Sequence, residues 1–145
     1  MAAIRSQSFG GSKVIEIAGG LGICTAEIAK RAGSNGEVIS YEVDEDRVEI
    51  MSETLELNRV RNAVDIRHDY VESIDEDCDV LILDCEGSEI EILESGYGDP
   101  QTIIVETHPV FDVPTEEVQE ILKQDGYDIA RVHEGVNIDV VEAHR

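Results

Sequence analysis

The sequence predicts an α/β fold built on one doubly wound sheet of seven strands, mostly parallel and closed by a C-terminal antiparallel hairpin. Short apolar runs alternate with segments of helical spacing, which is typical of βαβ units and a parallel sheet. The run at residues 79–84 (DVLILD) is almost continuously apolar, as a strand buried on both faces would be. Two strand-like segments separated by Glu134 and Gly135 end the sequence and indicate the hairpin.

The elements follow one another in a regular order. The predicted strands cover residues 13–18, 37–43, 63–67, 79–84, 102–106, 127–133 and 136–142. The predicted helices cover residues 23–32, 44–56, 88–95 and 114–124. Asp44 is suited to cap the second helix, Pro114 to open the fourth and Gly126 to stop it. Residues 1–12 are predicted to be a short N-terminal tail, residues 13–145 a single domain, and the link at 69–78 to carry little or no helix.

Length and composition limit the class of protein. The chain has 145 residues, about one domain, and 41% of them are hydrophobic. No apolar run approaches the ~20 residues of a membrane span, and residues 1–10 lack the apolar core of a signal peptide. The three cysteines have no CxxC spacing, which argues against a disulfide framework and a structural zinc site. We therefore expect a cytoplasmic protein without membrane contact.

The net charge of −22 is the most unusual property of the composition, with 33 acidic against 11 basic side chains spread along the chain. Such a body repels itself in dilute salt, whereas at about 1 M salt the Debye length falls to ~3 Å and screens the repulsion. In this respect the sequence resembles proteins from halophilic organisms. An acidic surface for a basic partner is the alternative. The charge also makes nucleic acid an unlikely partner.

A glycine-rich turn separates the first predicted strand from the first helix. Gly20 and Gly22 allow the backbone to approach a ligand closely, and the following helix offers free N–H groups. Glu42 follows Gly22 by twenty residues at the end of the second strand, where a carboxylate can accept both hydroxyls of a ribose. The pattern indicates a nucleoside-type cofactor pocket, although a turn with an unrelated surface glutamate is the simpler alternative.

The third glycine of a nicotinamide fingerprint is replaced by Thr25, and the chain has no room for the substrate domain of a dehydrogenase. The pattern E-x-x-x-G-x-G from Glu16 to Gly22 resembles instead motif I of class I S-adenosylmethionine-dependent methyltransferases, which have a Rossmann-like fold. The resemblance implies S-adenosyl-L-methionine as cofactor, with Glu16 near its methionine end and Glu42 on its ribose. Ala18 stands where the family often has glycine and adds a methyl group beside the cofactor.

Further cofactor and family features lie downstream. Asp69, just after the third strand, is placed to meet the adenine amine, or else is a turn residue. Residues 84–93 (DCEGSEIEIL) resemble the D-x-E-G-x-E-x-x-x-L segment of FkbM-type methyltransferases, and residues 104–109 (IVETHP) resemble their fifth-strand motif. The resemblance covers roughly residues 13–110. Residues 36–49 are also similar to methyltransferases that act on transfer RNA adenine.

Three side chains at strand ends are candidates for chemistry on a methyl acceptor, and we expect them to surround the same crevice as the cofactor. Asp84 is expected near the transferring methyl group, with capping of the next helix as the alternative. Glu86 would bind the acceptor or complement the helix dipole. His108 is the candidate general base, with a solvated loop histidine as the alternative. A magnesium site of Asp84, Glu86 and Glu106 is conceivable, but we predict no metal.

The resemblance implies a methyltransferase that O-methylates a hydroxyl of a small molecule or sugar. The expected partner is a small-molecule acceptor, and the protein is expected to be a monomer or homodimer. A transfer RNA-type methyltransferase and a cofactor-binding but catalytically idle module are the alternatives.

Overall fold

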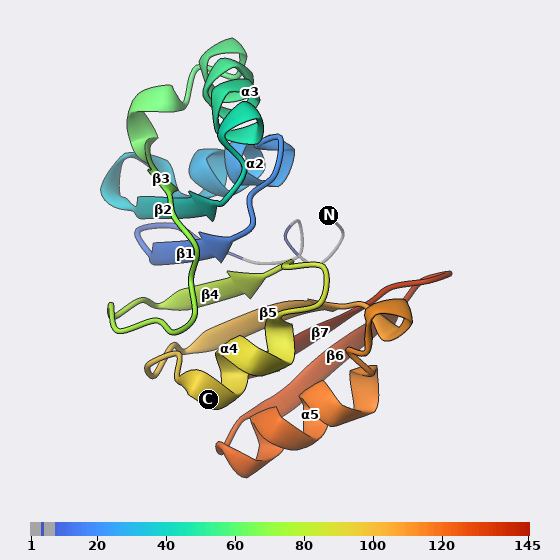
Figure 1. Ribbon diagram of the computed structural model, residues 1–145. Coiled ribbons are helices and arrows are strands. Elements are labelled where there is room, and N and C mark those ends of the chain that lie inside the picture. Colours follow the sequence, from blue (N-terminus) through green and yellow to red (C-terminus); the bar gives the residue numbers. More distant parts are fainter. Residues whose placement is uncertain (1–3, 5–7) are drawn as a thin grey trace. The chain divides into compact units, whose positions relative to one another are not determined.

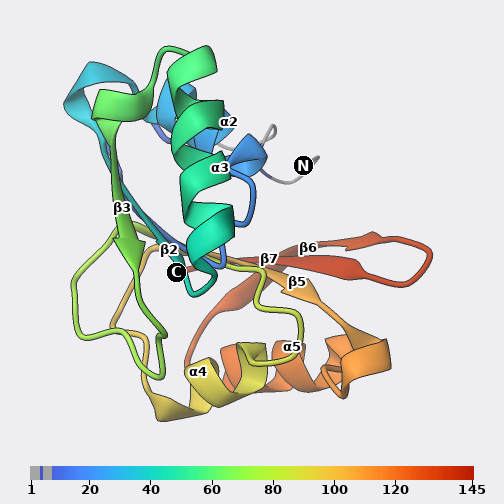
Figure 2. The same cartoon turned by 45° about the horizontal axis from the view of Figure 1, so that its top comes forward.

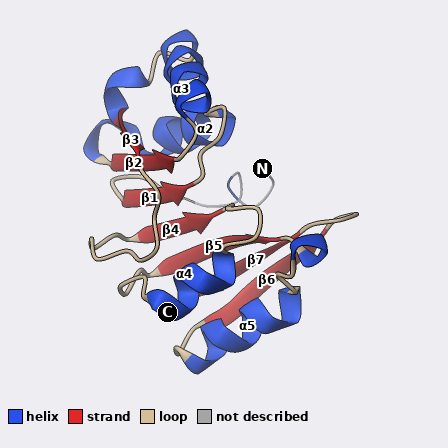
Figure 3. Cartoon of the chain, in the orientation of Figure 1, coloured by secondary structure: helices blue, strands red, loops and turns tan. Residues whose placement is uncertain are grey.

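The computed structural model describes Ile4 and residues 8–145, so part of the predicted N-terminal tail lies outside the described residues. The chain divides into two compact units, Met1–Val71 and Glu72–Arg145. Figure 1 labels the elements along the chain, and Figure 3 separates helices from strands by colour. In the part of the chain that is described, no helix is long and apolar enough to cross a membrane.

Unit 1, over its residues 8–71, combines three parallel strands with the helices α2 and α3 and two short 3-10 turns. Its elements are β1 (Lys13–Ile17), α2 (Ile23–Ala32), η1 (Gly33–Asn35), β2 (Glu37–Glu42), α3 (Glu45–Leu57), η2 (Arg61–Ala63) and β3 (Val64–His68). The strands lie in the order β3-β2-β1, and the register pairs Ile15 with Ile39. The two helices pack against each other, as Figure 2 shows.

The core of unit 1 explains why these segments are strands and helices. Val14, Ile15 and Ile39 are buried in the strands, and Met51 and Leu55, one turn apart on α3, are buried as well. Each such side chain contributes about 1.5–3 kcal/mol on burial. The predicted cap of α3 is confirmed, since the Asp44 carboxylate accepts the backbone N–H groups of the first turn at 2.9 and 3.1 Å.

Unit 2 carries four strands in the order β4-β5-β7-β6. Its elements are β4 (Val80–Leu83), α4 (Glu89–Ser95), β5 (Thr102–Thr107), η3 (Pro109–Phe111), α5 (Thr115–Gln124), β6 (Asp128–Glu134) and β7 (Asp139–His144). β4 and β5 are parallel, whereas β7 pairs antiparallel with both β5 and β6. Leu81, Leu83 and Ile103 are fully buried in the strands, and Leu122 of α5 packs into the same core. α4 and α5 lie side by side in both views (Figures 1 and 2).

The predicted elements are confirmed with small shifts in their ends. The link before β4 contains neither helix nor strand, as expected. The hairpin strands begin one and three residues later than predicted, because the turn is closed by the Gly135 N–H, which donates to the Asp139 carboxylate at 3.0 Å. α4 begins at Glu89 with Ser88 in the capping position, so Asp84 does not cap this helix.

Candidate cofactor and catalytic sites

The glycine-rich loop of unit 1 consists of residues 18–22, between β1 and α2. Gly20 and Gly22 have φ values of 56° and 78°, in the left-handed region that glycine adopts without strain. Ala18, with φ 62°, occupies the same region although it carries a Cβ. The N-cap residue of α2 is Gly22, which gives the helix no side-chain cap.

Close packing beneath the loop explains why glycine occupies positions 19 and 22. A Cβ at Gly19 would lie 2.8 Å from both Glu16 Oε2 and Met51 Cε, and closer still to the Ser40 hydroxyl. A Cβ at Gly22 would lie 2.7 Å from Met51 Cγ. The loop backbone therefore rests directly on β1, β2 and α3, and side chains there would push it outward.

Glu16 lies under this loop and is 2% exposed. Its Oε2 accepts hydrogen bonds from the hydroxyls of Thr25 at 2.6 Å and Ser40 at 2.7 Å. Burial raises the pKa of the Glu16 carboxyl, and the two hydroxyl donors oppose that shift. The predicted cofactor-binding residue thus also ties β1 to β2 and to α2.

Glu42 ends β2 and is likewise 2% exposed. Its Oε2 accepts the N–H of Gly20 at 2.9 Å, and its Oε1 accepts the N–H of Asp44 at 3.0 Å. Each carboxylate oxygen has about two lone-pair positions, so both retain capacity for a further donor. Glu42, the residue predicted to bind the ribose, is therefore in contact with the glycine loop.

Asp69 follows β3 and is exposed. Its Oδ1 accepts the N–H of Tyr70 at 2.9 Å, which is a local turn contact. The neighbouring His68 imidazole contacts the Val43 carbonyl oxygen at 2.9 Å and thereby joins the ends of β3 and β2. The role of Asp69 toward adenine remains a prediction.

In unit 2 the three predicted catalytic residues have different environments. Asp84 follows β4 and is half-buried, and His108 follows β5 and is 6% exposed. The alternative of a solvated loop histidine is therefore wrong. Glu86 is exposed and has a positive φ of 51°, a strained conformation for a non-glycine residue.

The His108 imidazole lies among three carboxylates. Its Nδ1 is 2.9 Å from Glu89 Oε1, and its Nε2 is 3.7 Å from Asp84 Oδ1 and 3.8 Å from Glu106 Oε1. We call these four residues the His108 cluster. Sequence reasoning missed Glu89 as a site residue. It expected Glu106, at the end of the fifth strand, beside the same crevice, and assigned it no role other than that of a conceivable metal ligand. The signal for Glu89 was present in its place within the DCEGSE segment.

One ligand atom from each of Asp84, Glu106 and His108 lies within 4.8 Å of the others. Carboxylate oxygens with an imidazole nitrogen are a donor set that several divalent ions accept. Among the described residues, Glu86 does not belong to this group, although the magnesium alternative had included it. The expectation of no metal remains a prediction.

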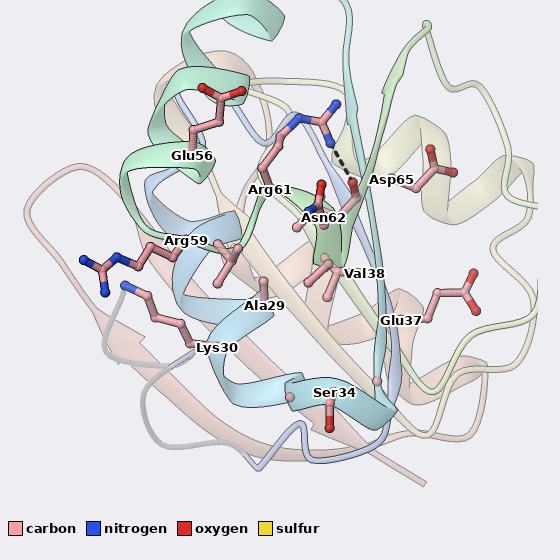
Figure 4. Close-up of a pocket in the computed structure, with 15 residues that line it drawn as sticks. Ala29, Lys30, Ser34, Glu37, Val38, Glu56, Arg59, Arg61, Asn62 and Asp65 are labelled. Atoms are coloured by element: carbon pink, nitrogen blue, oxygen red, sulfur yellow. Dashed lines mark hydrogen bonds between the residues drawn. The ribbon is translucent and has the colours of Figure 1, made fainter.

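Unit 1 also has a pocket of about 1060 Å³ away from the glycine loop (Figure 4). Lys30, Arg59 and Arg61 line it, but so do the carboxylates of Glu37, Glu56 and Asp65, and the six charges cancel. None of the predicted site residues lines this pocket. It therefore offers no concentrated positive surface for a phosphate backbone.

Comparisons with known proteins identify the fold. A SAM-dependent methyltransferase from Aquifex aeolicus superposes with a TM-score of 0.76 and 18% identity, over 98% of this chain and 86% of its own. An O-methyltransferase from Thermotoga maritima gives 0.69 and 21%, over 99% and 63%. Fibrillarin from Aeropyrum pernix, with natively bound S-adenosyl-L-methionine, gives 0.68 and 14%, over 94% and 68%. At these identities the likeness shows the fold, which is the predicted Rossmann-like, mostly parallel seven-stranded architecture with a C-terminal antiparallel hairpin.

The comparison with protein families is more specific. No curated protein sequence matches the chain. The family described as the methyltransferase FkbM domain matches residues 13–129, which is more than half of the chain. This range includes the glycine loop, Glu42 and all members of the His108 cluster. The protein therefore belongs to the FkbM family of S-adenosylmethionine-dependent methyltransferases.

Proposed function

We propose that this protein transfers the methyl group of S-adenosyl-L-methionine to a hydroxyl of a small molecule or sugar. The His108 cluster carries this proposal. A hydroxyl is a weak nucleophile until its proton is removed, and a general base contributes about 10²–10⁴-fold to such a step. A buried imidazole whose Nδ1 is held by Glu89 presents Nε2 for that purpose.

In this proposal, unit 1 binds the cofactor. Both oxygens of Glu42 have capacity left to accept the ribose hydroxyls. The loop at Ala18, Gly20 and Gly22 lies along the methionine part, Glu16 supports that loop from below, and Asp69 receives the adenine amine. The cofactor supplies an electrophilic methyl group on a positively charged sulfur.

Unit 2 would bind and activate the acceptor. His108 takes the hydroxyl proton at Nε2, while the half-buried Asp84 accepts a hydrogen bond from the acceptor near the transferring methyl group. The exposed Glu86 contacts a second polar group of the acceptor. Orientation of the acceptor oxygen in line with the carbon–sulfur bond would supply much of the remaining acceleration.

The net charge of −22 favours a small acceptor over RNA, because an RNA-binding surface must neutralise phosphates. The structural similarity to an O-methyltransferase from Thermotoga maritima agrees with a hydroxyl acceptor. The RNA alternative predicts a gel shift at micromolar protein concentration in high salt, which we do not expect.

The test is transfer from methyl-labelled S-adenosylmethionine to a panel of sugars, phenols and hydroxy acids, with mass spectrometry to locate the label. We expect S-adenosylhomocysteine to form together with a methyl ether. His108→Ala should slow transfer about 10²–10⁴-fold and leave S-adenosylhomocysteine affinity unchanged. His133→Ala removes another imidazole of unit 2 and serves as the control. Methylation of amines only, or of RNA, would contradict the proposal.

A further inference from the structure

Glu89 is fully buried, at 0% exposure, although it is a carboxylate at the first position of α4. Its Oε1 accepts the N–H of Cys85 and its Oε2 the N–H of Gly87, each at 2.9 Å. The third contact is His108 Nδ1, at 2.9 Å from Oε1. Removing a carboxylate from water costs several kcal/mol, so a residue that merely complements the helix dipole would lie at the surface.

These contacts determine where the imidazole hydrogen lies. Both oxygens of Glu89 accept backbone N–H groups, as the oxygens of a carboxylate do. An ionised carboxylate can only accept, so His108 must donate through Nδ1–H. In the neutral ring the lone pair then lies on Nε2, and Nε2 is too far from Asp84 and Glu106, at 3.7 and 3.8 Å, to be engaged in a hydrogen bond with either.

We propose that Glu89 is a positioning residue that fixes His108 in the Nδ1–H tautomer, with Nε2 directed to the proton of the acceptor hydroxyl. The inference rests on the proposed function. As the hydroxyl O–H bond breaks, its proton passes to Nε2 and the oxygen forms a bond to the methyl carbon. The carbon–sulfur bond breaks and its electron pair stays on sulfur, giving S-adenosylhomocysteine. The resulting imidazolium lies among Glu89, Asp84 and Glu106, whose charges stabilise it.

The same carboxylate holds the loop that carries the acceptor-binding residues. Cys85 and Gly87 flank Glu86, and both donate to Glu89. Gly87 has φ 129° and Glu86 has φ 51°, a tight path that brings the two N–H groups onto one side chain. Glu89 therefore couples the position of this loop to the orientation of the base.

Replacing Glu89 by glutamine is the sharpest perturbation. The amide keeps one acceptor oxygen and gains an NH₂ donor, so it cannot accept N–H groups at both of its ends. With its NH₂ toward His108 and Cys85, the amide makes Nδ1 the acceptor and moves the hydrogen to Nε2, where it blocks proton transfer. With its oxygen there, the amide keeps the Nδ1–H tautomer and places its NH₂ against the Gly87 N–H. A wrong tautomer of this kind lowers kcat by up to about 10⁴-fold in a histidine-dependent protease. We expect a kcat loss of up to about 10²–10⁴-fold that follows the Nε2–H fraction of the ring. KM should change as well, because the amide releases one N–H of the loop around Glu86.

The tautomer of His108 can be measured directly, without a methyl acceptor. Long-range ¹H–¹⁵N correlation spectra at a pH of about 8.5, where imidazoles are ordinarily neutral, distinguish Nδ1–H from Nε2–H rings. The chain has four histidines, and His108→Gln assigns the relevant signal. We expect Nδ1–H in the unaltered protein and in Glu89→Asp, which keeps the carboxylate. We expect an Nε2–H population in Glu89→Gln, and loss of the Nδ1–H preference in Glu89→Ala, which has no acceptor at this position. Glu91→Gln, an exposed substitution on the same helix, is the matched control.

The outcomes separate the two proposals. An Nε2–H ring in the unaltered protein, which needs no variant to fold, would overturn the role of Glu89. So would a Glu89→Ala protein that keeps the Nδ1–H ring, or a Glu89→Gln protein whose loss of kcat does not follow the Nε2–H fraction of its ring. An Nδ1–H protein that methylates no hydroxyl would instead overturn the proposed function.

Discussion

Substitution of Glu42 tests the cofactor site most directly. If its two oxygens accept the two ribose hydroxyls, Glu42→Ala removes two hydrogen bonds to a charged group, each worth about 1.5–3 kcal/mol. The sum of about 3–6 kcal/mol corresponds to at least ~10²-fold weaker binding. The variant also frees the Gly20 N–H, now held at 2.9 Å, so the glycine loop loses an anchor as well.

Glu42→Gln should weaken cofactor binding by a smaller factor, because the amide retains one acceptor oxygen. Losing about one charged hydrogen bond predicts ~10–100-fold weaker binding, between the unaltered protein and Glu42→Ala. Glu37→Gln is the matched control, since Glu37 begins the same strand and is exposed.

Calorimetry with S-adenosylhomocysteine in 2–3 M potassium chloride, a condition chosen for charge screening, measures these differences. Thermal unfolding gives a second readout, since ligand at 100 times its Kd stabilises by about 2.7 kcal/mol, or on the order of 10 °C for a domain of this size. NAD should give no shift. Normal binding of S-adenosylhomocysteine by Glu42→Ala would refute the ribose assignment.

Three further predictions concern stability. Ala18→Gly should stabilise the protein by about 0.5–1 kcal/mol in urea unfolding, because relief of the left-handed strain at φ 62° exceeds the added entropy of the unfolded chain; a loss of stability would contradict this. Burial raises the pKa of Glu16 above its ordinary value of 4.5, so the folded state retains this proton when the unfolded state has lost it. The Glu16 contribution therefore makes the free energy of unfolding decrease as pH rises from 4.5 through the raised pKa. Glu16→Gln should remove this decrease, which Tm measured against pH at fixed salt would show. With a net charge of −22, Tm should rise with potassium chloride up to about 1 M, whereas a flat Tm would show that self-repulsion is unimportant.

Much of the fold could be predicted because its signals are local. β4 is a continuous apolar run, β1 is a short strand with three apolar residues out of five, and the Asp44 cap directly precedes α3. The ends of the hairpin strands were predicted less accurately. The turn depends on a hydrogen bond from the Gly135 backbone N–H to the Asp139 carboxylate, and the pairing of the two strands shifts in register between Ile129 and Arg131. Such contacts leave no periodicity in the sequence.

The candidate site residues likewise divide into those that a local motif predicts and those that are brought together only by the fold. Glu16, Gly20 and Gly22 belong to one short motif, and their spacing alone points to a ligand. Glu89 and His108 are 19 residues apart, and nothing in the spacing shows that one would orient the other. Glu89 belongs to the DCEGSE segment, but its complete burial and its contact with His108, and not the sequence, show which acid of that segment holds the imidazole.

Glu42 in unit 1 and Glu89 in unit 2 make the same pattern of hydrogen bonds. Each is buried, and each accepts one backbone N–H at each oxygen, from Gly20 and Asp44 in one case and from Cys85 and Gly87 in the other. A carboxylate with both oxygens engaged in this way can still accept a hydrogen bond from another donor. At Glu89 that donor is the imidazole of His108, whereas at Glu42 the described residues show no further hydrogen-bond donor. The capacity left on Glu42 is therefore what a ribose would use, and the glutamine variants of both residues test one principle at two positions.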